Sequence, residues 1–250
     1  MMVSRTFWIA YARKLSALDT RAGDLMRDYI ERNGLEDMES LVAYAYRLVQ
    51  TYGSASSELA CECYDALAEY YGETVPSAEP AEISDYEEVA TAVYGANKQS
   101  LIGAVIPLAI ARLVKQVSAD TMIKNARRDR AFWAWIPIGD TCPYCLSLAA
   151  EGWKRASQGV QDGDHARHIH GGCDCTFSIR FSEDGGVEGY DPDKYAQMVE
   201  DAPGDTEREK LNAMRREAYA QNSAEINAQK RSAYEKRKER ESSQAEEIDV

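Results

Sequence analysis

The sequence predicts a mainly helical protein of the α+β class, with a small region of strands in its second half. Alanine and tyrosine are abundant while valine and isoleucine are sparse, which favours helices over sheets. Apolar residues also recur at helical spacing through the first half of the chain. A run of aromatic residues at 132–138 then interrupts this pattern, and four of the six cysteines follow it closely. The chain is long enough to bury a sizeable core.

Helical spacing, bounded by glycine, proline or a capping residue, predicts a series of helices before residue 131. They cover residues 6–33, 36–52, 54–71, 84–94, 98–115 and 120–130. Gly34, Gly53 and Gly72 are expected to end the first three. Pro107 is expected to kink or split the fifth, because proline lacks the amide that a helix interior requires.

Two further features of this half are its turn chemistry and its cysteines. Residues 73–83, rich in Pro, Ala and Glu, are predicted to be a linker, and Ser84 with Glu87 forms a capping box that opens the next helix. Cys61 and Cys63 are two positions apart on a predicted helix, so they face different ways. We interpret both as small packing residues.

The charge of the chain is strongly negative and unevenly placed. The formal net charge is −13, which argues against general coating of nucleic acid. Residues 49–97 contain no Lys or Arg but ten acids: Glu58, Glu62, Asp65, Glu69, Glu73, Glu79, Glu82, Asp85, Glu87 and Glu88. This stretch is either a solvated acidic face or a docking surface for a basic partner.

The sequence indicates a soluble chain made in a cytoplasm, with no membrane partner. The apolar run at residues 7–12 is too short for a signal peptide, and the run at 101–111 is too short to cross a membrane. In a reducing compartment, paired cysteines are more often metal ligands than disulfides.

The character of the sequence changes at residue 131. Residues 132–138 predict a strand that leads to Cys142, and Pro143 suits the first turn of a helix that continues to Trp153. Residues 175–181 alternate: Cys175, Phe177, Ile179 and Phe181 would share one face of a half-buried strand.

Two short cysteine hooks flank the loop between these strands. Cys142 and Cys145 form a Cys-x2-Cys hook, while Cys173 and Cys175 form a Cys-x-Cys hook with His170 three residues earlier. This spacing predicts a structural zinc site and a zinc-stapled β/α knuckle. A tetrahedral site takes four ligands, so which four of these five bind stays open, with reduced thiols without metal as the alternative. His165 and His168 are expected to be solvated or to lie outside the ligand set.

The sequence therefore divides into a helical domain (1–130), a zinc-knuckle domain (131–190) and a helical, partly flexible C-terminal arm (191–250). Residues 206–241 carry ten basic and seven acidic residues in a helix-favouring segment. This segment is either a solvated helix or an arm that docks on an acidic partner or on nucleic acid.

Most enzymatic motifs are missing. There is no Gly-rich phosphate loop, no Gly-x-Ser-x-Gly and no His-Glu-x-x-His, which indicates a non-enzyme without a small-molecule substrate. The alternative is a thiol oxidoreductase with Cys142 as nucleophile, because Cys142-Pro-Tyr-Cys145 is identical to the glutaredoxin dithiol motif. However, the Thr-Val-Pro triplet of that fold follows its dithiol, whereas Thr74-Val-Pro precedes it here. A third hypothesis is a zinc protein that binds nucleic acid through residues 206–241.

The order of these features resembles the minor head, or head morphogenesis, proteins of tailed phages and prophages. The Mu-type proteins share the ending His-x-x-Cys-x-Cys, here His170, Cys173 and Cys175. Minor capsid proteins of phages of Gram-positive bacteria are more similar still, because a Tyr-Asp-Pro-x-x-Tyr segment follows the strand, here at residues 190–195. The resemblance covers about residues 5–200.

This resemblance implies a structural protein of the virion, in the head interior beside the portal, and in the host cytoplasm during assembly. It implies the portal protein and the major capsid or scaffold protein as partners. The C-terminal arm lies outside the resemblance, and its basic residues predict packaged DNA as a further partner. It implies no catalysis.

Overall fold

The computed structural model describes residues 1–99, 105–139, 141–156, 169 and 175–220, with six residues of 223–235. It divides into two compact units, Met1–Thr141 with Cys145–Ala196 and Cys142–Tyr144 with Gln197–Val250. The described residues are mainly helical, as predicted, and they contain two small sheets. No zinc-binding group is found among them, and the three-part division at residues 130 and 190 stays a prediction.

Helices α1 (Arg5–Asn33) and α2 (Met38–Tyr71) are the longest elements of the first unit. They end before Gly34 and Gly72, both with φ near +74° (74° and 73°), as their glycines predicted. Asp37 caps the start of α2, since its carboxylate accepts the amide of the third residue on, Ser40, at 3.0 Å.

The predicted break at Gly53 is wrong, because α2 runs through it without interruption. Gly53 is buried, and a Cβ placed there would lie 3.1 Å from Cγ2 of Ile83 and 3.5 Å from Cγ2 of Val117. Glycine costs only about 1 kcal/mol within a helix, so it can be used for close packing without ending the element. Gly53 is therefore a contact point of the core.

Helices α3 (Tyr86–Gln99) and α4 (Ile106–Arg128) differ from their predictions in their boundaries. Asp85, one residue after the predicted Ser84, makes the cap bond to the amide of Glu88 at 2.9 Å. The expectation of two separate helices over residues 98–115 and 120–130 is wrong, because α4 is one helix that covers most of both ranges. Pro107 stands in the first turn of α4, where its missing amide is harmless, and the helix continues unbroken to Arg128.

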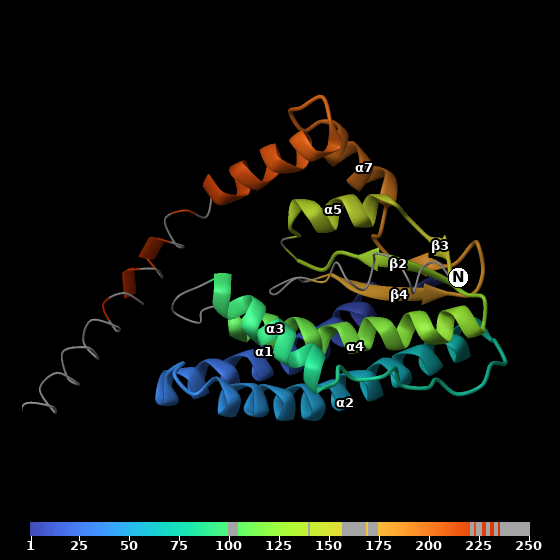
Figure 1. Cartoon of the computed structure of the whole chain (residues 1–250). Coiled ribbons are helices and arrows are strands. Elements are labelled where there is room, and N and C mark those ends of the chain that lie inside the picture. The colour runs from blue at the N-terminus through green and yellow to red at the C-terminus, as the bar shows by residue number, and fades with distance from the viewer. Residues whose placement is uncertain are drawn as a thin grey trace, which may run out of the picture. The chain divides into compact units, whose positions relative to one another are not determined.

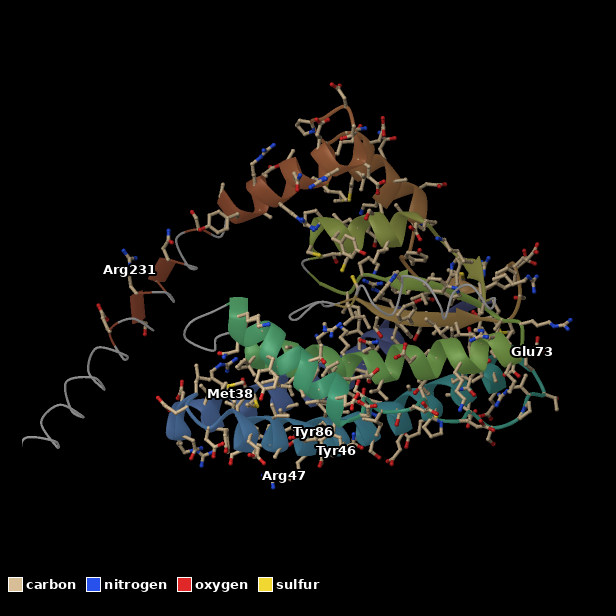
Figure 2. The ribbon with its side chains drawn as sticks, viewed as in Figure 1. Met38, Tyr46, Arg47, Glu73, Tyr86 and Arg231 are labelled. Carbon is tan, nitrogen blue, oxygen red and sulfur yellow. The ribbon has the colours of Figure 1, made fainter. Side chains whose placement is uncertain are left out.

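The core between α1, α2, α3 and α4 consists mainly of aliphatic residues and alanine. It contains Ala22, Met26, Leu41, Val42, Ala45, Leu48, Val49, Val89, Val93, Ala96, Ile106, Ile110, Leu113 and Val114. At its border, Tyr46 of α2 and Tyr86 of α3 meet edge to face, with ring centroids 5.5 Å apart (Figure 2).

Residues 73–83, which we call the strap, are bound to the helices through side chains. Three strap amides donate to helix side chains: Ala78 to Asp65 Oδ1 at 2.8 Å, Glu79 to Asn125 Oδ1 at 2.9 Å and Ala81 to Thr121 Oγ1 at 3.0 Å. These bonds replace the ladder that a strand would have.

The strap carbonyls are also bonded. Asn125 Nδ2 donates to Glu79 O at 2.8 Å and Lys124 Nζ to Pro80 O at 3.0 Å, while Arg128 donates to both Pro76 O and Ser77 O. The predicted linker is thus an ordered segment, and two cations of α4, Lys124 and Arg128, help to hold it.

The main sheet has the strand order β3-β2-β4 and is antiparallel throughout. Its strands are β2 (Phe132–Ile136), β3 (Lys154–Arg155) and β4 (Thr176–Arg180). Trp133 and Trp135 of β2 pack on Phe177 of β4, with ring centroids 5.2 and 4.1 Å apart. A second, parallel pair joins β1 (Met2–Val3) to β5 (Gly186–Val187).

The prediction that β4 is half-buried is wrong, because both of its faces are buried. Thr176 and Ser178, expected to face solvent, are 6% and 0% exposed. Phe181, just past β4, meets Tyr64 of α2 on one side, and Figure 1 shows α5 (Pro143–Ala150) on the side of β2 away from α4. The alternating pattern of apolar and polar residues could not reveal that the polar face of β4 is also buried.

The described part of the second unit is mainly helical. Helix α7 (Pro192–Glu200) crosses the boundary of the units, and residues 207–220 form a further helix. Thr206 and Glu209 form a capping box: Oγ1 of Thr206 accepts the amide of Glu209 at 3.3 Å, and Oε2 of Glu209 accepts the amide of Thr206 at 3.0 Å. Among the described residues, no helix combines the length and apolarity that crossing a membrane requires.

Candidate metal centre

The register of β2 and β4 brings the chain segments next to the two cysteine hooks to the same end of the sheet. Ile136, the last residue of β2, pairs with Thr176, the first residue of β4. Pro137 directly follows this pair along the chain and Cys175 directly precedes it, so both residues adjoin the same end of the sheet. The chain runs from this end of β2 to the first hook, and it returns from the second hook into β4 at the same end of the sheet.

Two thiols near this end are removed from solvent. Cys175 is 0% exposed and Cys145, in the first turn of α5, is 1% exposed. Cys142 directly precedes Pro143, the first residue of α5 as predicted, and is partly exposed. A helix N-terminus favours the thiolate over the thiol, and the thiolate is the form that binds metal.

Polar groups from distant parts of the chain surround Cys175. Burial raises the pKa of Tyr195, Arg5 lowers it, and Cys175 raises it, so Arg5 and Cys175 each lie within electrostatic range of Tyr195. Nη2 of Arg5 donates to the carbonyl of Pro137 at 3.0 Å, at the sheet end that Cys175 also adjoins. Sequence inspection missed Arg5 because nothing in its surroundings along the chain relates it to the hooks.

The Tyr-Asp-Pro-x-x-Tyr segment belongs to these surroundings. Tyr190 is 8% exposed, and its hydroxyl donates to the carbonyl of Ala149 at the end of α5 at 2.7 Å. Its ring stacks on that of Tyr195, with centroids 6.0 Å apart. The segment therefore fixes the C-terminal end of the helix that carries Cys145 at its start.

The structure describes three of the five predicted ligands: Cys142, Cys145 and Cys175. His170 and Cys173, like His165 and His168, lie outside the described residues. Within the described part of the chain, no three His, Cys, Asp or Glu side chains form a group that could hold a metal ion, and no disulfide joins two described cysteines. Buried thiols at one sheet end suit a thiolate-rich zinc site in kind, while the full ligand set stays a prediction.

The two cysteines of α2 have a different environment. Cys63 is 4% exposed, and burial raises its pKa. Burial also raises the pKa of Cys61, helped by the carboxylate of Asp65. Both thiols stay protonated at neutral pH and are weak nucleophiles and ligands. The surroundings of Cys63 agree with a packing role. Neither Cys61 nor Cys63 belongs to a group of described residues that could hold a metal ion.

The acidic stretch lies along α2, the strap and the start of α3. Nine of its ten carboxylate residues are exposed, and Asp65, which binds the strap, is the half-buried one. Glu73, at the start of the strap, is one of the exposed nine (Figure 2). A solvated acidic face accounts for these exposures, and docking of a basic partner stays a hypothesis.

Comparison with known proteins gives one family match. A family model described as VG15 protein matches residues 2–202, which extend from β1 to just beyond α7. No match was found among curated proteins or among solved structures.

Proposed function

The chain belongs to the VG15 protein family, a family of viral gene products, and from this premise we propose that it is a phage minor capsid protein. In this proposal it is a structural component of the head interior near the portal, and it passes through the host cytoplasm during assembly. It turns over no substrate.

One observation supports a structural role for the cysteine region: the register of β2 and β4. Because Ile136 pairs with Thr176, two hooks that are far apart in sequence are attached to one end of a sheet that is buried on both faces. A zinc ion bound there would crosslink the two segments, as closed thiolate-rich sites do. Its ligands would be Cys142 and Cys145 together with two of His170, Cys173 and Cys175.

The partners of this proposal follow from charge. The exposed carboxylates of α2 and the strap would contact basic surfaces of the portal, major capsid or scaffold protein. The C-terminal arm, with ten basic residues over 206–241, would contact packaged DNA.

The location is tested by mass spectrometry of purified particles. We expect this chain in DNA-filled heads at fewer copies than the major capsid protein, and in heads separated from tails. Heads that contain the portal protein but none of this chain would overturn the proposal.

The zinc site is tested by metal analysis of chain purified under reducing conditions without chelator. We expect about one zinc per chain, with the hook thiols shielded from alkylation until the metal is removed. Cys145→Ser should lose the metal, because Cys145 is a ligand in every version of the proposed set, and Cys61→Ser is the matched control that should keep it. Absence of metal would instead support the oxidoreductase alternative if the Cys142 and Cys145 dithiol reduces a glutathione mixed disulfide to two free thiols and is itself oxidised to the Cys142–Cys145 disulfide.

A further inference from the structure

The C-terminal end of α4 and the neighbouring strand β3 form a cationic corner in a strongly acidic chain. We define the corner by Arg128, Arg130, Lys154 and Arg155. Arg128, Arg130 and Arg155 are exposed, and Lys154 is half-buried. Arg155 comes from β3, yet its Nη1 donates to the carbonyl of Arg130 at 3.1 Å, so the corner joins two elements.

The carboxylates of this corner are already engaged. Asp129 has a side chain only 5% exposed; it pairs with Arg128 at 2.8 Å and accepts the hydroxyl of Tyr64 at 2.8 Å. Glu151 pairs with Lys154. Since Arg128 also binds the strap, the positive charge presented to solvent is mainly that of Arg130 and Arg155.

Arg130 occupies a backbone conformation that disfavours an arginine. Its φ is +55°, and it is the one non-glycine residue with positive φ in the part of the chain that the structure describes. The amides of Arg130 and Ala131 close the end of α4 on the carbonyls of Arg127 and Ala126, at 3.3 and 2.8 Å, a position that usually takes glycine. An arginine at a position that favours glycine suggests that its side chain has a function.

Arg155 is held in place for contact with a ligand. Its guanidinium carbon lies 4.4 Å from the centroid of Phe132, and Arg180 lies 5.0 Å from the same ring. Stacking and the bond to Arg130 restrict the side chain but occupy only part of the donors of the guanidinium. An arginine fixed in this way loses little rotamer entropy on binding a phosphate with its fork of donors.

Two simpler explanations account for fewer features of the corner than a phosphate ligand does. The helix dipole stabilises cations at the end of α4, which accounts for Arg128 but not for Arg155 on another element. A protein partner would favour an apolar centre, and none of the large exposed apolar residues among those described belongs to the corner or its neighbours along the chain. Phosphate contacts require charge and donors alone.

We propose that this corner binds the phosphate backbone of duplex DNA through Arg130 and Arg155. The proposal goes beyond the minor capsid role and differs from the contact assigned above to the C-terminal arm. Because only phosphates are contacted, binding is independent of base sequence and weakens steeply with salt.

The test measures binding of the full-length chain to a fluorescein-labelled 20-base-pair duplex by anisotropy between about 50 and 200 mM salt. The double variant Arg130→Gly with Arg155→Gln should lower the slope of log K against log salt by about 1.8, since each phosphate contact contributes about 0.9. The matched control removes two exposed α1 cations, Arg13→Gln with Arg21→Gln, and should leave the slope within about 0.3 of the parent value, well below one contact.

Arg130→Gly alone separates binding from folding. Glycine relieves the positive φ, so the thermal midpoint should rise by about 2–4 °C while DNA affinity falls. A lower midpoint would show that Arg130 is a structural residue and would overturn the assignment.

A third full-length variant tests the arm: Lys236→Gln, Arg237→Gln and Lys238→Gln. Loss of all DNA binding in this variant, with the slope of the corner variant unchanged, would overturn the corner proposal. Equal affinity for polyglutamate and for the duplex would overturn it as well. Neither outcome depends on whether the chain is found in virions.

Discussion

The helical core between α1 and α4 and the sheet of β2 and β4 bury apolar residues in different ways. The helical core spreads its burial over many small side chains, among them Ala22, Ala45 and Val49. The sheet concentrates its burial in Trp133, Trp135 and Phe177, each 1–2% exposed. The apolar contacts of the helical core are therefore shared among many residues, whereas those of the sheet depend on a few large rings.

The largest expected effect concerns the sheet. Trp135→Ala removes a buried ring whose centroid lies 4.1 Å from that of Phe177, so the free energy of unfolding should fall by about 3–5 kcal/mol. Denaturant unfolding followed by circular dichroism measures this loss. In metal-free, reduced chain, the variant should also speed alkylation of Cys145 and Cys175.

The comparison residue for Trp135 is Leu41, which is 0% exposed in the helical core. Leu41→Ala should cost about 2–5 kcal/mol but leave the alkylation rates of Cys145 and Cys175 at the parent values under strongly native conditions. Equal acceleration in both variants would show that the two regions open as one cooperative unit, and the contrast drawn above would fail.

The second effect concerns the strap. Asn125 is 1% exposed and binds both the amide and the carbonyl of Glu79, so Asn125→Ala should cost about 1–3 kcal/mol. Hydrogen exchange should accelerate at the amide of Glu79 more than at that of Ala81, which Thr121 holds independently. In Thr121→Val the order should reverse, and uniform acceleration along the strap in both variants would contradict residue-by-residue attachment.

The third effect is a pH dependence within the helical region. Burial, with a further contribution from Glu88, raises the pKa of Asp120 to about 6, while a bond to Gln116 opposes the shift. The native chain therefore keeps this proton between about pH 4 and 6 while the unfolded chain loses it, so stability falls as pH rises through that window and levels off above it.

Asp120→Asn should remove this component and raise stability at pH 7 by about 1–2 kcal/mol. Unfolding curves of parent and variant at pH 4, 5, 6 and 7 measure the difference, which should be smallest at pH 4. A constant difference at all four values would show that Asp120 has an ordinary pKa.

The smallest effect compares two helical glycines. Gly95→Ala on α3 meets no atom within 4 Å and should stabilise by about 0.5–1 kcal/mol. The same change at Gly53 brings Cβ to 3.1 Å from Ile83, so the propensity gain should be cancelled or reversed. Thermal unfolding measures both, and an equal gain at the two sites would show that the core at Gly53 yields freely.

The helical elements were largely predictable because their apolar period is local. Residues 6–33 correspond closely to α1, and the strands at 132–138 and 175–181 contain β2 and β4. Errors arose where a distant segment determined the outcome. Gly53 lies within a helix because Ile83 and Val117 pack closely against it. The second face of β4 is buried because elements elsewhere in the chain cover it.

The candidate metal centre was predictable only in its cysteine spacing. The sequence predicted both hooks, and the strand register now attaches them to one sheet end, but the ligand set stays a prediction. Arg5 and Tyr195 could not be assigned to the surroundings of Cys175 from sequence, because the chain brings them there from opposite ends of the first unit.

The strap has an evolutionary consequence. Its position depends on its own backbone and on side chains of other elements, chiefly Thr121 and Asn125 of α4 and Asp65 of α2. Most strap side chains should therefore tolerate substitution at little cost in stability. Substitutions at those three helix positions, in contrast, should displace the strap, although the three residues lie outside it. In a comparison of family members, the residues at these helix positions should therefore show whether the strap is kept better than the residues of the strap itself.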